Sequence, residues 1–255
     1  MKQSTRHQQI IELAQAQGFV STDELVASFK VSPQTIRRDL NELSELQQIR
    51  RHHGGASVLE SSVTNDPYAS RKIRLQQEKQ AIAKSICEQI PDGASLFLDI
   101  GTTSETIAQG LLNHKDLRVV TNNLNVASIL MPKQDFKVIV AGGEVRNRDG
   151  GIVGEATIDF IKQFRLDFGI VTVSGIDLDG SLLDFDYHEV RVTQAIISSA
   201  RHVMLAADHT KFARNAMVNI GHIRQLDQIF SDKQAPEPLL KQIEASDVKF
   251  VLCAI

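Results

Sequence analysis

Apolar and polar positions along the first fifty residues recur with a period that predicts three short helices. From Arg6 to Gly18 the apolar residues fall on one helical face, and glycine is a common signal for the end of a helix. The sequence Ser-Thr-Asp-Glu at 21–24 is a capping box that opens a second helix. A third helix is expected to begin at Ser32, a good N-cap, with Pro33 at its first position. Because the second and third helices are joined by a very short connection, the pattern favours a helix-turn-helix.

The third helix has an apolar face and a polar face. Ile36, Leu40 and Leu43 recur at i, i+4 and i+7, which is the spacing of a buried stripe. The side chains on the opposite face and its flanks are Gln34, Thr35, Arg37, Arg38 and Asn41. Groups of this kind suit the base edges and phosphates of a DNA major groove, although an ordinary solvated helix face has a similar composition. We therefore expect a recognition helix that contacts DNA with these five side chains and with Ser32.

A short basic hairpin is expected directly after the third helix. The Gly-Gly pair at 54–55 is a turn signal between two short extended runs, which indicates the β-wing of a winged helix. Arg50, Arg51 and His53 would place hydrogen-bond donors beside a DNA backbone phosphate. The neighbouring histidines could also suggest a metal site, but no further cysteine or carboxylate follows at ligand spacing. A solvated basic loop that binds no DNA is the remaining alternative.

These motifs resemble the DeoR family of bacterial transcriptional repressors. The resemblance rests on Ser-Pro-x-Thr-Ile-Arg-Arg-Asp-Leu at 32–40 and on Arg-x-His-Gly-Gly-Ala at 51–56. The family's recognition-helix and wing positions match here at Gln34, Thr35, Arg37, Arg38, Arg51, His53, Gly54 and Gly55. The resemblance implies that residues 1–58 form a winged helix-turn-helix domain that binds operator double-stranded DNA.

The rest of the chain predicts an α/β domain with a largely parallel sheet. Residues 59–72 are expected to be a linker, because the stretch up to Asp66 is polar, rich in turn-forming residues and followed by Pro67. A helix is predicted over 71–90, and apolar strands then alternate with amphipathic helices. The predicted strands are 95–99, 117–121, 136–141, 168–173, 202–207, 228–231 and 248–252. The predicted helices between them are 103–112, 124–131, 155–163, 189–200 and 238–245. We take 73–255 as one effector-binding and oligomerisation domain.

Polar loops follow five of the predicted strands, at the edge where parallel sheets bind ligands. The first reads Asp-Ile-Gly-Thr-Thr at 99–103 and enters a helix, whose N-terminus can hold a phosphate with backbone N–H groups. The others lie at 121–123, 141–148, 174–177 and 208–212. Any one of them could be a plain turn or helix cap. Five such loops on one edge favour a small polar ligand, and their arginine and lysine side chains favour an anionic one, such as a phosphate.

This half also resembles the sensor domain of the DeoR family, which is similar to ribose-5-phosphate isomerase. The resemblance implies effector-binding residues at Arg71, Lys79, Asp99, Gly101, Thr102, Thr103, Asn122, Gly142, Gly143, Glu189, Asp208 and Lys211. The chain departs from the family at Thr193 and Gln194, where many members carry a Lys-Arg pair. The likeness is greatest to members that control glycerol metabolism, which implies that sn-glycerol 3-phosphate is the effector. No cofactor and no metal are expected.

The composition is that of a soluble globular protein and limits where DNA can bind. The chain has 255 residues, of which 42% are hydrophobic and 23% charged, and its net charge is −3. Residues 1–58 hold 7 Lys/Arg and 6 Asp/Glu, and the remainder holds 21 and 25, so a DNA-binding surface must be local. Cys87 and Cys253 lie far apart in apolar stretches, which favours two core residues over a disulfide. No apolar run reaches the length of a membrane span and no signal peptide is recognisable, so we expect a cytoplasmic protein.

A repressor released from DNA by a phosphorylated effector is the function that these features favour. Asp99, Glu189, Asp208 and Lys211 could include an acid and a base. A sugar-phosphate isomerase needs a carboxylate base, however, and none is assignable at the spacing that isomerases use, so no enzymatic activity is expected. A structural DNA-bound protein would leave the five polar loops unexplained. One recognition helix reads too few base pairs for useful specificity, so a homo-oligomer, either a dimer or a tetramer, is expected.

Overall fold

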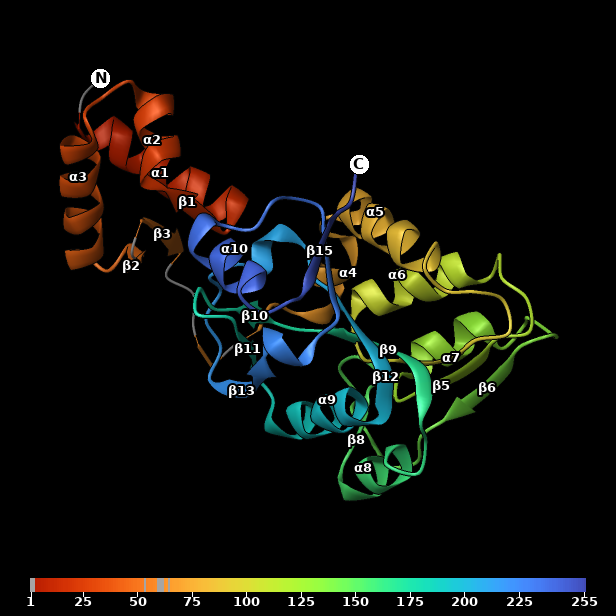
Figure 1. Cartoon of the computed structure of the whole chain (residues 1–255). Helices are drawn as coiled ribbons and strands as arrows, with labels where there is room; N and C mark the ends of the chain where they lie inside the picture. Colours follow the sequence, from red (N-terminus) through yellow and green to blue (C-terminus); the bar gives the residue numbers. More distant parts are fainter. Residues whose placement is uncertain (1–2, 53, 59–61, 64) are drawn as a thin grey trace.

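The computed structural model describes residues 3–52, 54–58, 62–63 and 65–255, which form two regions (Figure 1). The elements of the first region are α1 (Gln3–Gln17), β1 (Phe19–Ser21), α2 (Thr22–Phe29), α3 (Pro33–Glu45), β2 (Ile49–His52) and β3 (Gly55–Val58). The three predicted helices and the wing hairpin are confirmed. Strand β1, which the sequence did not predict, pairs antiparallel with β3 and completes a sheet of order β1-β3-β2.

Side-chain caps set the starts of α2 and α3. The Ser21 hydroxyl accepts a hydrogen bond from the backbone N–H of Glu24, and the Glu24 carboxylate accepts one from the N–H of Ser21, which is the predicted capping box. The Ser32 hydroxyl accepts from the N–H of Thr35, with Pro33 in the first turn. The apolar stripes of the helices meet beneath these caps in a core that includes Ile10, Leu25, Ile36, Leu40 and Leu43.

The second region is built on a seven-stranded sheet in which every neighbouring pair of strands is parallel. Its strands are β4 (Ser95–Leu98), β5 (Arg118–Thr121), β6 (Lys137–Val140), β9 (Leu166–Thr172), β12 (Ala200–Ala206), β14 (Gln228–Ser231) and β15 (Lys249–Leu252). Their order is β15-β14-β12-β9-β4-β5-β6. Each of the seven predicted strands corresponds to one of them, so the predicted parallel α/β sheet is confirmed.

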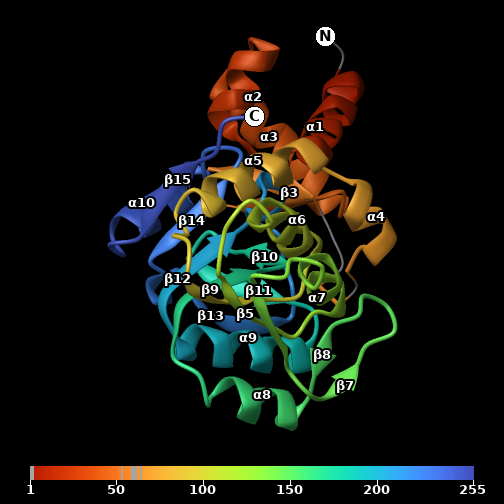
Figure 2. The same cartoon turned by 90° about the vertical axis from the view of Figure 1, so that its right-hand side faces the viewer.

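Helices cover both faces of this sheet and bury its apolar side chains in two cores (Figure 2). One core contains residues of α5 (Gln76–Cys87), α6 (Thr102–Leu111) and α7 (Leu124–Leu130). The other contains residues of α8 (Glu155–Ile161), α9 (Tyr187–Ser199) and α10 (Glu237–Glu244). Cys87 and Cys253 are buried free thiols in the first of these cores, as predicted. In the described ranges, no helix has the length and apolar character needed to cross a membrane.

Several short strands beside the main sheet were not predicted. Strands β7 (Glu144–Val145) and β8 (Ile152–Val153) form a small hairpin. Strands β10 (Gly175–Ile176), β11 (Ser181–Asp184) and β13 (Val218–His222) form a separate antiparallel sheet. Strands β7, β8 and β10 have two residues each, too few to show an alternation of apolar and polar positions, which is why the sequence pattern did not reveal these three.

The single helix predicted over 71–90 is wrong, because the chain breaks there into α4 (Tyr68–Ile73) and α5. Leu75 lies between them with φ 53°, in the left-handed region that ends a helix. The Lys79 amine donates hydrogen bonds to the carbonyl oxygens of Arg71 and Arg74, at 2.8 Å for Arg74. This side chain satisfies carbonyls that a continuous helix would have bonded to its own backbone. All of α4 except its last residue, Ile73, therefore falls in the stretch 59–72 that was predicted as linker.

The two regions touch each other at the end of α1. Gly18 follows α1 with φ 78°, and a Cβ atom there would lie 3.2 Å from the Cα of Thr210. Thr210 belongs to the 3-10 turn η1 (His209–Lys211), which comes soon after β12. The loop beyond the carboxyl end of β12 thus packs against the first region.

Candidate DNA-binding face and effector site

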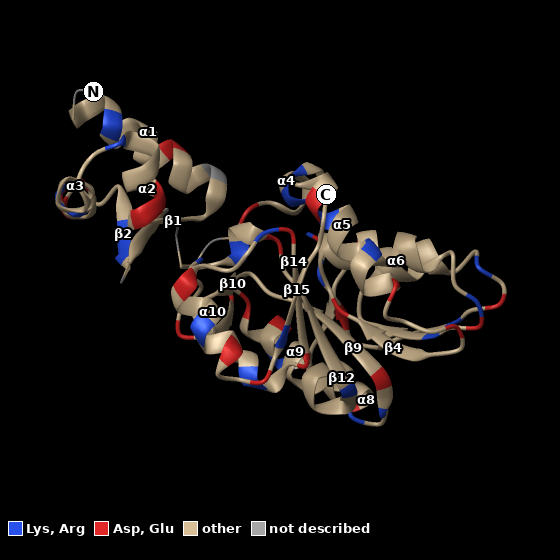
Figure 3. Ribbon diagram, turned by 45° about the horizontal axis from the view of Figure 1, so that its top comes forward, with Lys and Arg blue, Asp and Glu red and all other residues tan. Residues whose placement is uncertain are grey.

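The recognition helix α3 lies at the outer edge of the first region, away from the seven-stranded sheet (Figure 1). Its predicted DNA-contacting side chains Gln34, Arg37, Arg38 and Asn41 are exposed, and Thr35 is half-buried. Arg50 is exposed on β2, a strand that contacts α3 (Figure 3). The first region therefore offers the amide and guanidinium groups of a helix and of its wing together to solvent.

Two other predicted DNA-binding residues also make contacts within the fold. The Ser32 hydroxyl caps α3 and lies 2.9 Å from the hydroxyl of Thr35. The Arg51 guanidinium donates to the carbonyl oxygen of Gly55 at 3.3 Å. Burial and the charge of Arg37 lower the pKa of Arg51, so the helix and the wing bring two guanidinium groups close enough to repel each other. An anionic phosphate between them would relieve this repulsion. His53 lies outside the described residues.

A buried ion pair holds α3 against α1. The Arg6 guanidinium contacts Asp39 through Nε at 2.5 Å and Nη2 at 2.9 Å, and His7 Nε2 lies 3.1 Å from the same carboxylate. Asp39 is 1% exposed, yet hydrogen bonds from Arg6 and His7 outweigh the effect of burial and hold its pKa below the usual value. The sequence pattern did not reveal this pair, since its members lie on different helices and neither belongs to an apolar stripe.

A cavity of about 40 Å³ lies at the carboxyl ends of β9 and β12, beside the N-terminus of α6. Seven of the twelve predicted effector residues line it, namely Arg71, Lys79, Gly101, Thr102, Thr103, Asp208 and Lys211. The remaining lining residues are Asp66, Arg74, Leu75, Thr172, Val173, Ala206 and Thr210. Loops after separate strands therefore converge on one site with the end of α4 and the start of α5.

The start of α6 has the geometry of an anion site. Gly101 has φ 149°, and a Cβ atom there would lie 2.7 Å from the Thr172 hydroxyl, so glycine is required for this close approach. The first turn of α6 receives no cap from its N-cap residue Gly101, which has no side chain. Its backbone N–H groups and the positive end of the helix dipole are therefore open to an anion. The hydroxyls of Thr102 and Thr103 stand beside them at the cavity.

The first cavity holds four cationic side chains, Arg71, Arg74, Lys79 and Lys211. Burial lowers the pKa of Lys79 to about 8 and also lowers that of Lys211. Burial would raise the pKa of Asp208, but the charge of Lys211 and hydrogen bonds from Thr210 hold it below its usual value. Within the described part of the chain, the Lys211 amine makes no hydrogen bond or ion pair. Burial of the Lys79 and Lys211 amines therefore favours a bound anion beside them.

A larger cavity of about 710 Å³ adjoins the first, and Asp66 and Arg71 line both. Its wall includes the carboxylates of Asp149, Asp184, Asp186 and Glu189 and the side chains of Asn65, Tyr68 and Phe185. Carboxylates and amides accept hydrogen bonds from hydroxyl groups. The second cavity therefore suits the polyol part of a ligand whose phosphate occupies the first.

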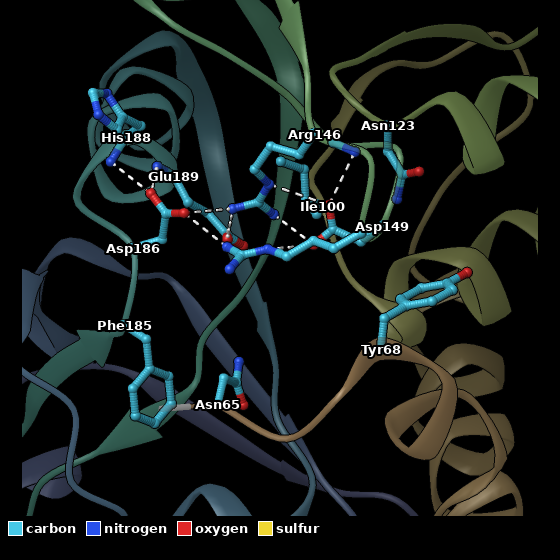
Figure 4. Close-up of polar contacts among 12 residues, drawn as sticks. Asn65, Tyr68, Ile100, Asn123, Arg146, Asp149, Phe185, Asp186, His188 and Glu189 are labelled. Carbon is cyan, nitrogen blue, oxygen red and sulfur yellow. Dashed lines mark hydrogen bonds and ion pairs between the residues drawn. The ribbon is translucent and has the colours of Figure 1, made fainter. Parts of the chain in front are cut away.

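Arg146 fixes the acidic wall of the second cavity (Figure 4). Its guanidinium makes two bonds to Asp149, at 3.1 and 2.7 Å, and single bonds to Glu189 at 2.6 Å and Asp186 at 3.1 Å. Burial and the charge of Asp184 hold the pKa of Glu189 above its usual range, although Arg146 opposes them. One arginine thus sets the positions of three carboxylates.

The other predicted effector residues lie away from the first cavity. Glu189 lines the second cavity, whereas Asp99, Asn122, Gly142 and Gly143 line neither. Asp99 is 1% exposed and accepts a hydrogen bond from Thr193 at 2.9 Å, and burial raises its pKa to about 7. The Asn122 amide donates to the carbonyl oxygen of Ile152 at 3.2 Å. Contact of these four residues with an effector stays a prediction.

Sequence reasoning missed several residues that line the first cavity. Thr172 ends β9, so its position at the end of a predicted strand was the available signal. Arg74 reaches the cavity only because the helix breaks at Leu75, which no periodicity indicates. No group of three or more His, Cys, Asp or Glu side chains that could hold a metal ion occurs among the described residues.

Two family models match the chain. The model described as "DeoR-like helix-turn-helix domain" matches residues 6–62. The model described as "DeoR C terminal sensor domain" matches residues 74–233. Together they cover the winged helix and the α/β region up to residue 233, but not residues 63–73, some of which line the two cavities.

Curated relatives align with the chain from end to end. A glycerol-3-phosphate regulon repressor of Escherichia coli (strain K12) is 59% identical over 99% of this chain and 100% of its own. The protein of the same name in Haemophilus influenzae is 53% identical over 99% of this chain and 98% of its own. The HTH-type transcriptional repressor CsqR of Escherichia coli (strain K12) is 40% identical over 97% of this chain and 94% of its own.

The chain is also similar, at low sequence identity, to solved structures. Ribose 5-phosphate isomerase A from Methanocaldococcus jannaschii is 11% identical over 52% of this chain and 53% of its own, with a TM-score of 0.39. At this level the similarity supports no statement about activity.

Proposed function

The chain belongs to the DeoR family, and on that basis we propose that it represses genes of glycerol and glycerol 3-phosphate metabolism. Full-length relatives with 59% and 53% identity carry the name glycerol-3-phosphate regulon repressor. The exposed polar face of α3 and the adjacent wing form the surface that would bind the operator. These relatives are transcriptional repressors, and they align with the chain over almost their whole length. They confirm the prediction that the chain is not an enzyme.

The effector of this repressor is sn-glycerol 3-phosphate. The observation that carries the assignment is the first cavity, where four cations surround the uncapped N-terminus of α6. The phosphate binds there, with Lys211 and the backbone N–H groups after Gly101 as donors. The glycerol hydroxyls point past Arg71 toward the carboxylates of the second cavity. The winged helix is thus the DNA-binding domain, and the α/β region is the sensor domain.

The repressor acts as a homo-oligomer in the cytoplasm. Two recognition helices read two half-sites, which gives the specificity that one short helix lacks. A protein that binds the operator must lie in the same compartment as the DNA, which in a bacterium is the cytoplasm.

Isothermal titration calorimetry of the full-length protein tests the effector assignment. We expect sn-glycerol 3-phosphate to bind, glycerol not to bind, and inorganic phosphate to bind more weakly. Lys211→Met should reduce the affinity about 30- to 100-fold, because one charge-assisted contact to the phosphate is lost. Lys162→Met, at an exposed lysine just after α8, is the matched control and should leave the affinity unchanged. Equal affinities for wild type and Lys211→Met would place the effector elsewhere.

A further inference from the structure

The segment 65–75, here called the strap, connects the DNA-binding domain to the sensor domain and separates the two cavities. Asp66 and Arg71 of the strap line both cavities, and Arg74 and Leu75 line the first. A ligand with its phosphate in the first cavity and its hydroxyls in the second must therefore contact the strap. A movement of the strap on ligand binding would therefore be transmitted to the DNA-binding domain.

The strap is held by the same groups that a phosphate would use. The Lys79 amine donates to the carbonyl oxygens of Arg71 and Arg74, and the Thr102 hydroxyl donates to the carbonyl of Arg71 at 3.4 Å. Both donors line the first cavity, and Lys79 is only 5% exposed. The strap carbonyls thus occupy donors beside the α6 N-terminus. A phosphate oxygen carries full negative charge and forms stronger bonds with such donors than a neutral carbonyl does.

The first cavity is small, and one of its walls must move for a phosphate to displace the strap carbonyls from Lys79 and Thr102. A volume of about 40 Å³ has room for a few water molecules, so only the phosphate of the effector would lie there, and its three-carbon chain would extend past the strap into the second cavity. The walls built by β9, β12 and α6 belong to the sheet and its packed cores. In contrast, none of the residues of α4 is buried. The strap is therefore the wall that can yield.

The remaining attachments of the strap are concentrated in its first half, where the Tyr68 hydroxyl donates to the buried Glu105 carboxylate at 2.8 Å. Asn65 donates to the Ser174 hydroxyl at 3.2 Å, and the Asp66 carboxylate lies 3.5 Å from the guanidinium groups of Arg74 and Arg214. The Asp66 side chain is 44% exposed, and ion pairs open to water contribute little to stability. Loss of the bonds from Lys79 and Thr102 therefore loosens residues 71–75, whereas Tyr68 still holds the first half of the strap.

We propose that the effector phosphate and the strap compete for Lys79 and Thr102, so that effector binding releases residues 71–75 of the strap from the sensor domain. This release shifts the segment that connects the two domains and so changes the position of the DNA-binding domain, and this is how the effector weakens operator binding. By linkage, operator DNA that holds the strap in place lowers the affinity for the effector by the same factor. The inference rests on the proposed function, because it takes the first cavity as the phosphate site.

Hydrogen–deuterium exchange of the full-length protein, with and without sn-glycerol 3-phosphate, tests this competition. The strap amides of Arg71 and Arg74 are bonded to the carbonyls of Pro67 and Ser70, and the Glu105 amide is bonded to the carbonyl of Gly101. We expect the effector to speed exchange in residues 71–74 at least fivefold and to slow it at the start of α6. Slower exchange in both segments would overturn the competition in favour of a closing lid, while leaving the effector site intact. No change in either segment would overturn both the competition and the effector site.

Two variants separate the strap contacts from the ligand. Lys79→Met keeps a long apolar stem and removes the donor, so the strap should exchange rapidly without effector and show no further increase with it. Thr102→Val removes one hydroxyl at similar volume and should cause a smaller increase in the same direction. Lys84→Met, at an exposed position of the same helix, is the control and should exchange as the wild type does. Wild-type exchange of the strap in both Lys79→Met and Thr102→Val would overturn the proposal.

Discussion

The DNA-binding face and the effector cavity both present cations to phosphate groups, but water reaches the two sets of cations very differently. Arg37, Arg38 and Arg50 are exposed on α3 and β2. Lys79 is 5% exposed, and burial lowers the pKa of Lys79 and of Lys211. The DNA-binding face keeps its cations in solvent, whereas the effector cavity removes the amines of Lys79 and Lys211 from it.

This difference matches the size of the anion in each case. DNA is a long polyanion surrounded by counterions, and exposed cations bind it by releasing them, so binding depends strongly on salt. A small phosphate must be distinguished from chloride and other anions, which requires an enclosed site with fixed donors. Enclosure makes the charge of a lysine sensitive to pH, whereas an exposed arginine stays charged. We therefore predict that the affinity for DNA depends on salt and that the affinity for the effector depends on pH.

The largest expected effect comes from the buried pair that positions the exposed cations. Asp39→Ala leaves the Arg6 guanidinium buried without its carboxylate, and breaking such a pair costs about 3–5 kcal/mol. Denaturant titration should show this loss in the DNA-binding domain, together with weaker operator binding. Effector affinity, measured by calorimetry, should be unchanged. Glu45→Ala, at the exposed end of α3, is the control. Wild-type unfolding of Asp39→Ala would show that the pair does not stabilise the domain.

An intermediate effect is expected from the exposed cations themselves. Arg50→Ala should weaken binding to every DNA sequence and reduce the slope of log affinity against log salt by about 0.9, the value for one phosphate contact. Arg38→Ala should instead cost about 1–3 kcal/mol on the operator and little on unrelated DNA, because it loses a base contact. Fluorescence anisotropy at several salt concentrations measures both quantities. An unchanged salt slope for Arg50→Ala would contradict the assignment of the wing.

The smallest effect is a pH dependence confined to the enclosed site. Lys79, with a pKa of about 8, is mostly protonated at pH 7 and mostly neutral at pH 9. A phosphate monoester stays fully charged over this range. The neutral amine binds phosphate less well, so effector affinity should fall about tenfold from pH 7 to pH 9. DNA affinity without effector should stay constant, because arginine remains charged. A flat calorimetric profile, equal to that of Lys79→Met, would show that Lys79 does not contact the phosphate.

Regular elements of this molecule could be predicted from sequence because each repeats a local pattern. The strand predicted at 228–231 coincides with β14 at both ends, and Ser32 caps α3 as its position before Pro33 indicated. The break at Leu75 could not be predicted, because a leucine with φ 53° leaves no signature in the hydrophobic pattern. That break decides where Arg71, Arg74 and Lys79 lie, and so it decides the shape of the effector cavity.

The sites could be predicted where their residues come from one segment. Gly101, Thr102 and Thr103 are consecutive at a helix start, and they line the cavity together. The Arg6–Asp39 pair and the contacts of Arg146 join residues far apart in the chain, so only the folded structure brings them together. Asn122 is polar and follows a strand, and its position therefore favoured a ligand-binding role. Its side chain is instead buried, and its amide donates a hydrogen bond to a backbone carbonyl oxygen.

The measurement that tests the account most directly is an anisotropy titration of operator DNA from glycerol-utilisation genes, with and without sn-glycerol 3-phosphate. We expect nanomolar-range binding that weakens at least tenfold with the effector, a change that corresponds to about 1.4 kcal/mol of coupling. Lys211→Met should bind the operator equally well and fail to respond. Binding that the effector leaves unchanged in the wild-type protein would contradict the coupling between the two phosphate sites.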